Sequence, residues 1–159
     1  MGVTQGALFR HFANKQEVWA AVMHWTAETL LARFDAVNGV TPVDKLWATF
    51  GAHIDFIVTY PGVPRILFGE LQREAEAPGK ALVLSLMGNY RSRVVTLIDA
   101  AKEQGLISNA VDSGTAATMF LGMVQGLVMQ AMAADNFSAM PAMANKLFPL
   151  YLAALGART

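Results

Sequence analysis

The first sixteen residues carry polar side chains of the types that hydrogen-bond to nucleic acid. They include three basic residues and no acidic one, and the first carboxylate is Glu17. Gln5 can bond an adenine edge through two hydrogen bonds, while Ala7 and the Thr4 methyl group can contact a thymine methyl. Gly6 would allow the backbone to approach closely. The stretch therefore has groups that can distinguish bases.

The three basic residues of this stretch could hold the phosphate backbone. They are Arg10, His11 and Lys15, and Lys15 lies where the next helix is predicted to begin, a position that itself attracts phosphate. Residues 4–12 are predicted to form a short helix with Thr4 as its N-cap. A surface helix that happens to be basic would have the same composition, so composition alone leaves both interpretations open.

No arrangement of residues suggests catalysis or metal binding. The three histidines, His11, His24 and His53, fall in three different predicted helices, and there is neither a phosphate-binding glycine loop nor a nucleophile elbow. The chain has no cysteine, which excludes disulfides and thiolate metal sites. We therefore predict no catalytic residues, no metal and no cofactor.

The composition indicates one domain with an apolar surface to cover. The chain has 159 residues, 54% of them hydrophobic and 15% charged, with a formal net charge of +0. The apolar excess suggests that part of the surface is buried against a partner. Because the net charge is zero, no strong electrostatic field attracts the chain to nucleic acid or to a membrane. The N-terminus lacks the apolar region of a signal peptide, so we predict a cytoplasmic protein.

Polar and glycine breaks divide the chain into helices. Asn14, Thr41 and either Asp112 or Ser113 are predicted N-caps, and Gly105 is a predicted C-terminal stop. Convincing strand signals are absent. With the short helix over 4–12, we predict an all-α fold of about seven helices, the others spanning 15–37, 42–60, 64–75, 80–104, 113–134 and 141–155.

The helix predicted over 113–134 is uncharged throughout and contains the spacing Gly122-x-x-x-Gly126. A dimerising transmembrane helix is one interpretation. Gln125 and Gln130 inside the helix, and acidic rather than basic residues at its ends, favour a helix buried in protein.

This helix has two different faces. The large apolar face, Phe120, Val124, Leu127 and Ala131, is predicted to fill the core. The small, mildly polar face would allow a symmetry mate to approach closely, together with part of the last helix. The predicted dimer interface comprises Thr118, Gly122, Gln125, Gly126, Met129, Phe148, Tyr151 and Leu152.

The opening "VTQGALFRHFANKQEVW" resembles the recognition helix and following turn of the tetracycline-repressor (TetR) family of bacterial transcription regulators. The matching positions are Gly6, Leu8, Phe9, His11, Phe12, Asn14, Lys15 and Glu17. Phe9 stands where that family most often has Tyr, so a hydroxyl contact is lost. The resemblance implies that DNA is contacted by Thr4, Gln5, Gly6, Ala7, Phe9, Arg10, His11 and Lys15.

The resemblance also implies a domain arrangement. Residues 1–20 would form part of a helix-turn-helix domain, and residues 21–159 a ligand-binding and dimerisation domain. Two further helices are expected upstream to complete the motif, so we expect the chain as given to bind operator DNA weakly or not at all. In a dimer, two recognition helices would reach major grooves about 34–36 Å apart.

In the family that the chain resembles, the middle helices enclose an effector. Each side chain predicted here to line that site could equally be a core residue, although nine methionines favour an adaptable pocket. Glu70 and Arg91 are further polar candidates. The predicted lining comprises Phe50, His53, Ile57, Phe68, Met87, Tyr90, Phe120 and Met123.

These patterns together predict a ligand-responsive transcriptional repressor. A homodimer would bind operator DNA and be released by a small apolar or amphipathic effector, with no membrane partner. The alternative is a helical dimeric module that binds a ligand or a protein without binding DNA.

Overall fold

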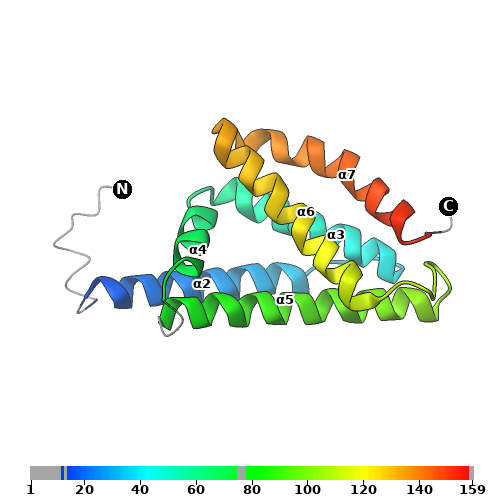
Figure 1. The fold of residues 1–159 in the computed structure, drawn as a ribbon, viewed down its shortest axis with the longest axis horizontal. Helices are drawn as coiled ribbons and strands as arrows, with labels where there is room; N and C mark the ends of the chain where they lie inside the picture. The colour runs from blue at the N-terminus through cyan, green and yellow to red at the C-terminus, as the bar shows by residue number, and fades with distance from the viewer. Residues whose placement is uncertain (1–11, 13, 75–77, 158–159) are drawn as a thin grey trace.

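The computed structural model describes residues 12, 14–74 and 78–157, and all regular elements within these ranges are helical (Figure 1). This confirms the predicted all-α fold, whereas the helix predicted over 4–12 lies outside the described residues. The elements are α2 (Lys15–Asp35), α3 (Pro42–Thr59), α4 (Val63–Leu71), α5 (Pro78–Glu103), α6 (Ser113–Ala134), the 3-10 helix η1 (Phe137–Ala139) and α7 (Met140–Ala154).

The predicted N-caps begin their helices in the structure. The Thr41 hydroxyl accepts a hydrogen bond from the Asp44 backbone N–H at 3.1 Å, and the Asp44 carboxylate accepts one from the Thr41 N–H at 2.9 Å. This reciprocal pair satisfies two donors that a helix start would otherwise leave unpaired. Asn14 caps α2 and Asp112 caps α6 through their side chains.

Left-handed residues end two of the long helices. Gly105 follows α5 with φ of 66°, and the Leu106 N–H returns to the Ala101 carbonyl at 2.9 Å. Asp135, with φ of 49°, ends α6. Both turns satisfy carbonyl groups at a helix C-terminus, as the glycine at 105 predicts.

The helix α5 is the centre of the arrangement. It lies beside α2 along one edge of the molecule and also contacts α3, α4 and α6 (Figure 1). α6 crosses over this base, α7 packs on α3 and α6, and the short α4 stands across the N-terminal end of α5. The interior of the protein is therefore enclosed by five helices, namely α2, α3, α4, α5 and α6.

Aromatic side chains fill the part of the core below α7. The ring centroids of Phe50 and Phe120 lie 5.3 Å apart, and those of Phe120 and Tyr151 lie 5.7 Å apart. The Tyr151 hydroxyl donates to the Ala116 carbonyl at 3.1 Å. Phe148 also packs in this cluster, 5.4 Å from Phe50.

The positions of Phe148 and Tyr151 correct the predicted dimer interface. Their side chains are 2% and 0% exposed, so they lie in the core of the protomer and not on its surface. The reason is that α7 presents its apolar stripe to α3 and α6 of the same chain, which leaves that stripe unavailable to a partner.

The predicted core face of α6 is confirmed, because Phe120, Val124, Leu127 and Ala131 are all buried. α6 is also long and apolar enough to cross a membrane by length and composition, with 39% of the apolar window buried within the protein. Its packing against α5, α7 and α3 identifies it as a core helix.

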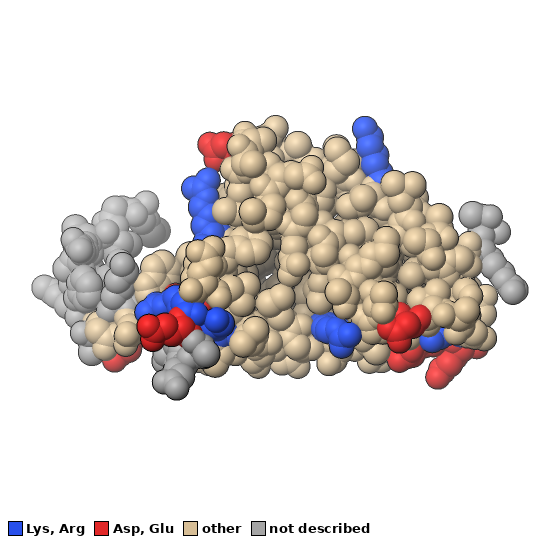
Figure 2. All heavy atoms as spheres, in the orientation of Figure 1, with Lys and Arg blue, Asp and Glu red and all other residues tan. Residues whose placement is uncertain are grey.

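Charged side chains gather along the edge formed by α2 and α5, while the α6 and α7 surface in the same view is nearly free of them (Figure 2). Asp35 of α2 forms an ion pair with Arg93 of α5. Arg65 of α4 lies 3.2 Å from Asp135 at the end of α6. The exposed large hydrophobic side chains of α6 and α7 include Met119, Met129, Met143 and Leu150.

Candidate functional site

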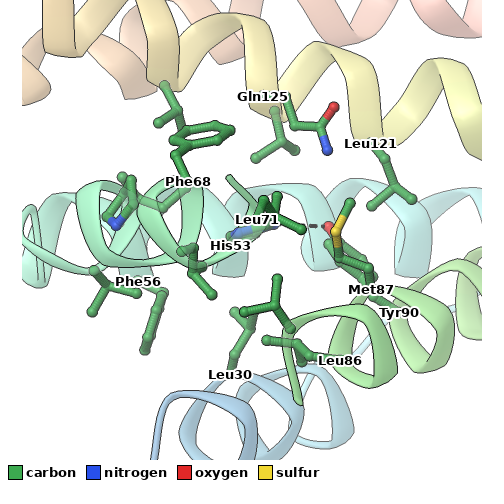
Figure 3. A pocket seen from close by; sticks show the side chains of 17 residues that line it. Leu30, His53, Phe56, Phe68, Leu71, Leu86, Met87, Tyr90, Leu121 and Gln125 are labelled. Atoms are coloured by element: carbon green, nitrogen blue, oxygen red, sulfur yellow. Dashed lines mark hydrogen bonds between the residues drawn. The ribbon is translucent and has the colours of Figure 1, made fainter. Parts of the chain in front are cut away.

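A cavity of about 100 Å³ lies among α2, α3, α4, α5 and α6 (Figure 3). Side chains from all five helices point toward it, including Leu30 of α2, Phe56 of α3, Leu86 of α5 and Leu121 of α6. It is partly open to the outside. The helices that pack around α5 thus leave a space between them that side chains do not fill.

The short helix α4 forms one wall of the cavity. Five of its residues line the space, namely Val63, Pro64, Leu67, Phe68 and Leu71. Their spacing places them on one helical face, so α4 presents an apolar face inward. Pro61 and Gly62 before the helix, and Pro64 in its first turn, mark a sharp change of direction after α3, and α4 therefore crosses the other helices.

Among the described residues, no Asp, Glu, Lys or Arg contributes to the lining, so the described lining carries no formal charge. The polar side chains in it are His53, Tyr90 and Gln125. Gln125 is exposed on α6, whereas the other two lie deep between α3 and α5. An ionised group placed in this cavity would have no oppositely charged partner, which is costly in an apolar site.

His53 and Tyr90 are joined by a hydrogen bond inside the protein. The His53 Nδ1 and the Tyr90 hydroxyl oxygen lie 3.1 Å apart, with ring centroids 5.1 Å apart. Phe34 of α2 packs against both rings, at 4.5 Å from Tyr90 and 6.0 Å from His53. The pair is therefore held in place by three helices.

The 3.1 Å separation fits either tautomer of His53, so we assign the tautomer from the hydrogen bonding that the Tyr90 hydroxyl needs. Within the described part of the chain, His53 is the only hydrogen-bond partner of the Tyr90 hydroxyl. A buried phenol donates its proton where it can, so Tyr90 donates to Nδ1 and the imidazole carries its own proton on Nε2. The Nε2–H is then a donor that no described side chain uses.

Burial keeps both rings neutral. Desolvation lowers the pKa of His53 to about 3 and raises the pKa of Tyr90 well above its ordinary value. His53 is enclosed by protein, yet its side chain is only half-buried by surface area. His53 is also one of the residues that line the cavity.

The family model of the tetracyclin repressor-like C-terminal domain matches residues 39–129, which is more than half of the chain. The chain belongs to the TetR family. The matched range contains α3, α4, α5 and most of α6, which are four of the five helices around the cavity.

Two curated proteins with similar sequences have the same name, nucleoid occlusion factor SlmA. The nucleoid occlusion factor SlmA of Haemophilus influenzae is 26% identical over 133 residues, covering 82% of this chain and 61% of the relative. The protein of the same name from Idiomarina loihiensis is 22% identical over 145 residues, covering 89% and 72%. The chain thus spans about three fifths of the length of the Haemophilus relative.

Solved structures of TetR-family proteins share the fold. A regulatory protein of this family from Rhodococcus superposes with a TM-score of 0.79 at 16% identity, covering 99% of this chain and 82% of the other. A TetR transcriptional regulator from Chloroflexus aurantiacus gives 0.77 at 20% identity, covering 96% and 79%. At such identities the likeness concerns the fold alone.

The structure separates the predicted ligand-binding residues of this TetR-family chain into two groups. His53, Ile57, Phe68, Met87 and Tyr90 line the cavity. Phe50 and Phe120 do not, since both are fully buried in the aromatic core, and Met123 packs against the core from α6. Three of the eight predicted positions thus belong to the packing of the domain.

Several lining residues were missed by the sequence-based prediction. Phe56, Leu121 and Gln125 line the cavity, although Gln125 was assigned to the dimer face. The helical spacing of Leu121, Val124 and Gln125 on α6 is a signal that could have identified this side of the helix. Sequence alone gave no indication of which neighbouring helix faces it.

Two other polar candidates lie away from the cavity. Glu70 is buried at the end of α4, where its carboxylate pairs with Arg73 at 3.1 Å and lies against Gly79. Arg91 is exposed and donates to the Gly114 carbonyl at 3.1 Å. Neither side chain lines the cavity; Glu70 forms a local ion pair, and Arg91 connects α5 to the start of α6.

The predicted DNA-contacting residues lie outside the described residues, except that Lys15 is the first residue of α2. α2 continues without a break through residue 20, so no structural boundary marks the predicted domain division there. Among the described residues, no three His, Asp or Glu side chains come together as metal ligands.

Proposed function

We propose that this TetR-family chain is part of a ligand-responsive transcriptional regulator in the cytoplasm, a repressor released from operator DNA when an effector occupies the cavity. The observation that carries the proposal is the uncharged cavity between α2 and α6 in a chain of this family. The dimer would exist in two forms, of which only one spaces the two recognition helices to fit operator DNA. An effector that binds better to the other form would shift the population away from DNA.

The contacts of α2 support a link between the cavity and the helix that follows the proposed DNA-binding residues in sequence. Leu30 of α2 lines the cavity directly. Phe56 of α3 also lines it, and its ring centroid lies 6.2 Å from that of Trp25 on α2. Trp25 in turn packs edge-on against Tyr60 at 4.9 Å. A ligand that displaces Phe56 or Leu30 would therefore act on α2.

The names of proteins with this fold support an apolar effector. A fatty acid degradation regulator from Bacillus halodurans gives a TM-score of 0.72 at 17% identity, and a ketosteroid transcriptional regulator from Mycobacterium tuberculosis gives 0.73 at 17%. Each superposition covers 99% of this chain. The hydrocarbon parts of the molecules in both names match the apolar lining here, and of the two a ketosteroid also lacks the charge of a fatty acid carboxylate.

We further propose a homodimer formed through α6 and α7. Because Phe148 and Tyr151 are buried in the protomer, the proposed interface now comprises Thr118, Gly122, Gln125, Gly126, Met129 and Leu152. The support is an exposed apolar surface on these two helices, which includes Met119, Met129, Met143 and Leu150 at 43–66% exposure. Such a surface favours covering by a second copy.

The dimer proposal predicts a specific effect of Met129→Glu. A two-fold contact would bring two unpaired carboxylates to one interface, so the dissociation constant of the dimer should rise by about tenfold or more. Analytical ultracentrifugation measures it. Leu84→Glu is the matched control, because Leu84 is 53% exposed on α5. Equal effects of the two substitutions would contradict the proposed interface.

The DNA-binding proposal is tested with the full gene product and the DNA that flanks its own gene. We expect binding that weakens steeply as salt concentration rises. Gln5→Ala should relax the sequence preference, whereas Lys15→Ala should weaken binding to all sequences alike. No preference for any flanking DNA over unrelated DNA, with both variants unchanged, would contradict the proposal and favour a ligand-binding module.

A further inference from the structure

The cavity is selective in charge as well as in polarity. We infer that it accepts a compact, uncharged ligand whose hydrogen-bond acceptor, such as a carbonyl oxygen, bonds to His53 Nε2–H. This inference rests on the proposed function, because it takes the cavity to be the effector site, and it defines the chemical class of the effector.

Charge is excluded by every wall of the cavity. The described lining residues, which come from α2, α3, α4, α5 and α6, include no Asp, Glu, Lys or Arg, and the titratable groups among them are His53 and Tyr90. Glu70 and Arg91, the two charged residues that the sequence offered as polar candidates for the site, are engaged elsewhere. A carboxylate or ammonium ion would lose its hydration and gain no counter-charge.

The acceptor requirement follows from the tautomer of His53. Nδ1 accepts the hydrogen bond from the Tyr90 hydroxyl, so the ring offers Nε2–H, which has no partner among the described residues. The ring borders the cavity in which it would meet a ligand (Figure 3). An acceptor placed there completes the hydrogen bonding of an otherwise unused donor.

The cavity also limits size. Its volume of about 100 Å³ is smaller than the ~150 Å³ of an apolar cavity that binds benzene. Met87 lines the space and is half-buried, and a methionine side chain can change rotamer to admit a slightly larger group. The group that lies next to His53 must therefore be compact, while the rest of a ligand such as pinacolone, which has more heavy atoms than benzene, would extend toward the open side of the cavity.

A set of probes with one shape and different charge tests the inference. Pinacolone is a neutral ketone, pivalate its carboxylate isostere, pinacolylamine an ammonium ion, and triptane a hydrocarbon of the same branching. Titration calorimetry, or ligand-observed NMR for the sparingly soluble triptane, measures binding near neutral pH. We expect pinacolone to bind at least about tenfold more tightly than pivalate or pinacolylamine, and about two- to tenfold more tightly than triptane.

Two variants of one residue test the role of the donor. His53→Gln keeps an N–H donor close to the position of Nε2, whereas His53→Leu removes it. We expect His53→Leu to abolish the advantage of pinacolone over triptane and His53→Gln to retain most of it. Retention of that advantage by His53→Leu would overturn the assignment of the donor.

The remaining outcomes separate this inference from the proposed function. Binding of pivalate or pinacolylamine as tight as that of pinacolone would overturn the charge selectivity while leaving an effector site in place. Binding of none of the four probes would overturn the cavity as a site for compact ligands. The DNA-binding measurement is independent of both results.

Discussion

Replacing Phe120 by alanine is expected to lower the free energy of unfolding by about 3–5 kcal/mol. Phe120 is fully buried on α6, and its ring lies among those of Phe50, Phe148 and Tyr151. Truncation would remove contacts with all three and leave a cavity that the surrounding helices cannot easily close. Urea denaturation of the wild-type chain and the variant measures the difference.

Phe68→Ala is the matched control for this prediction. Phe68 is also aromatic, but it is half-buried and borders the cavity, so truncation removes fewer contacts. We expect a smaller loss of stability from Phe68→Ala and a larger loss of probe binding. A loss of stability at Phe120 no greater than at Phe68 would contradict the division between core and cavity.

The stability of the chain is expected to depend on pH through His53. Burial lowers its pKa in the folded state to about 3, against about 6.5 in the unfolded chain. Below about pH 6.5 the unfolded state therefore binds a proton that the folded state does not. The free energy of unfolding should fall by about 1.4 kcal/mol per pH unit between about pH 6 and 4.5.

Carboxyl groups act at lower pH and can be separated from His53. A hydrogen bond from Arg93 lowers the pKa of Asp35, and one from the Thr41 backbone lowers the pKa of Asp44. Stability linked to a lowered carboxyl pKa is present above its usual value, near 3.8, and is lost as pH falls through the folded value. This loss occurs below the His53 range.

His53→Gln provides the control, since glutamine does not titrate. The decrease measured for the wild-type chain between about pH 6 and 4.5 should become smaller in this variant by about 1.4 kcal/mol per pH unit. Denaturant unfolding at several pH values gives both curves. Identical slopes for the two proteins would mean that His53 is not the group whose protonation is coupled to unfolding.

Helix positions could be predicted from sequence because the signals that begin and end a helix lie in a few neighbouring residues. The cap at Thr41, the cap at Asp112 and the stop at Gly105 each depend on a few neighbouring residues, and the structure confirms all three. The buried stripe of α6 was likewise predictable from its spacing. Local chemistry was sufficient for these features.

The cavity lining was harder to predict because it depends on how helices distant in sequence meet. Phe50 and His53 lie one turn apart on α3, yet Phe50 packs in the aromatic core and His53 borders the cavity. Helical spacing identifies the face of a helix that points inward. It does not reveal whether side chains of the neighbouring helices fill the space in front of that face or leave a cavity there. For the same reason, Tyr151 was assigned to a partner although α6 of its own chain covers it.

The most direct test of the cavity as the ligand site is a crystal structure of the protein with pinacolone. We expect the probe between α3, α4, α5 and α6, with its carbonyl oxygen about 2.7–3.2 Å from His53 Nε2. A probe bound only in the groove between α3 and α7, beside Trp47 and Pro149, with the cavity unchanged, would contradict this assignment.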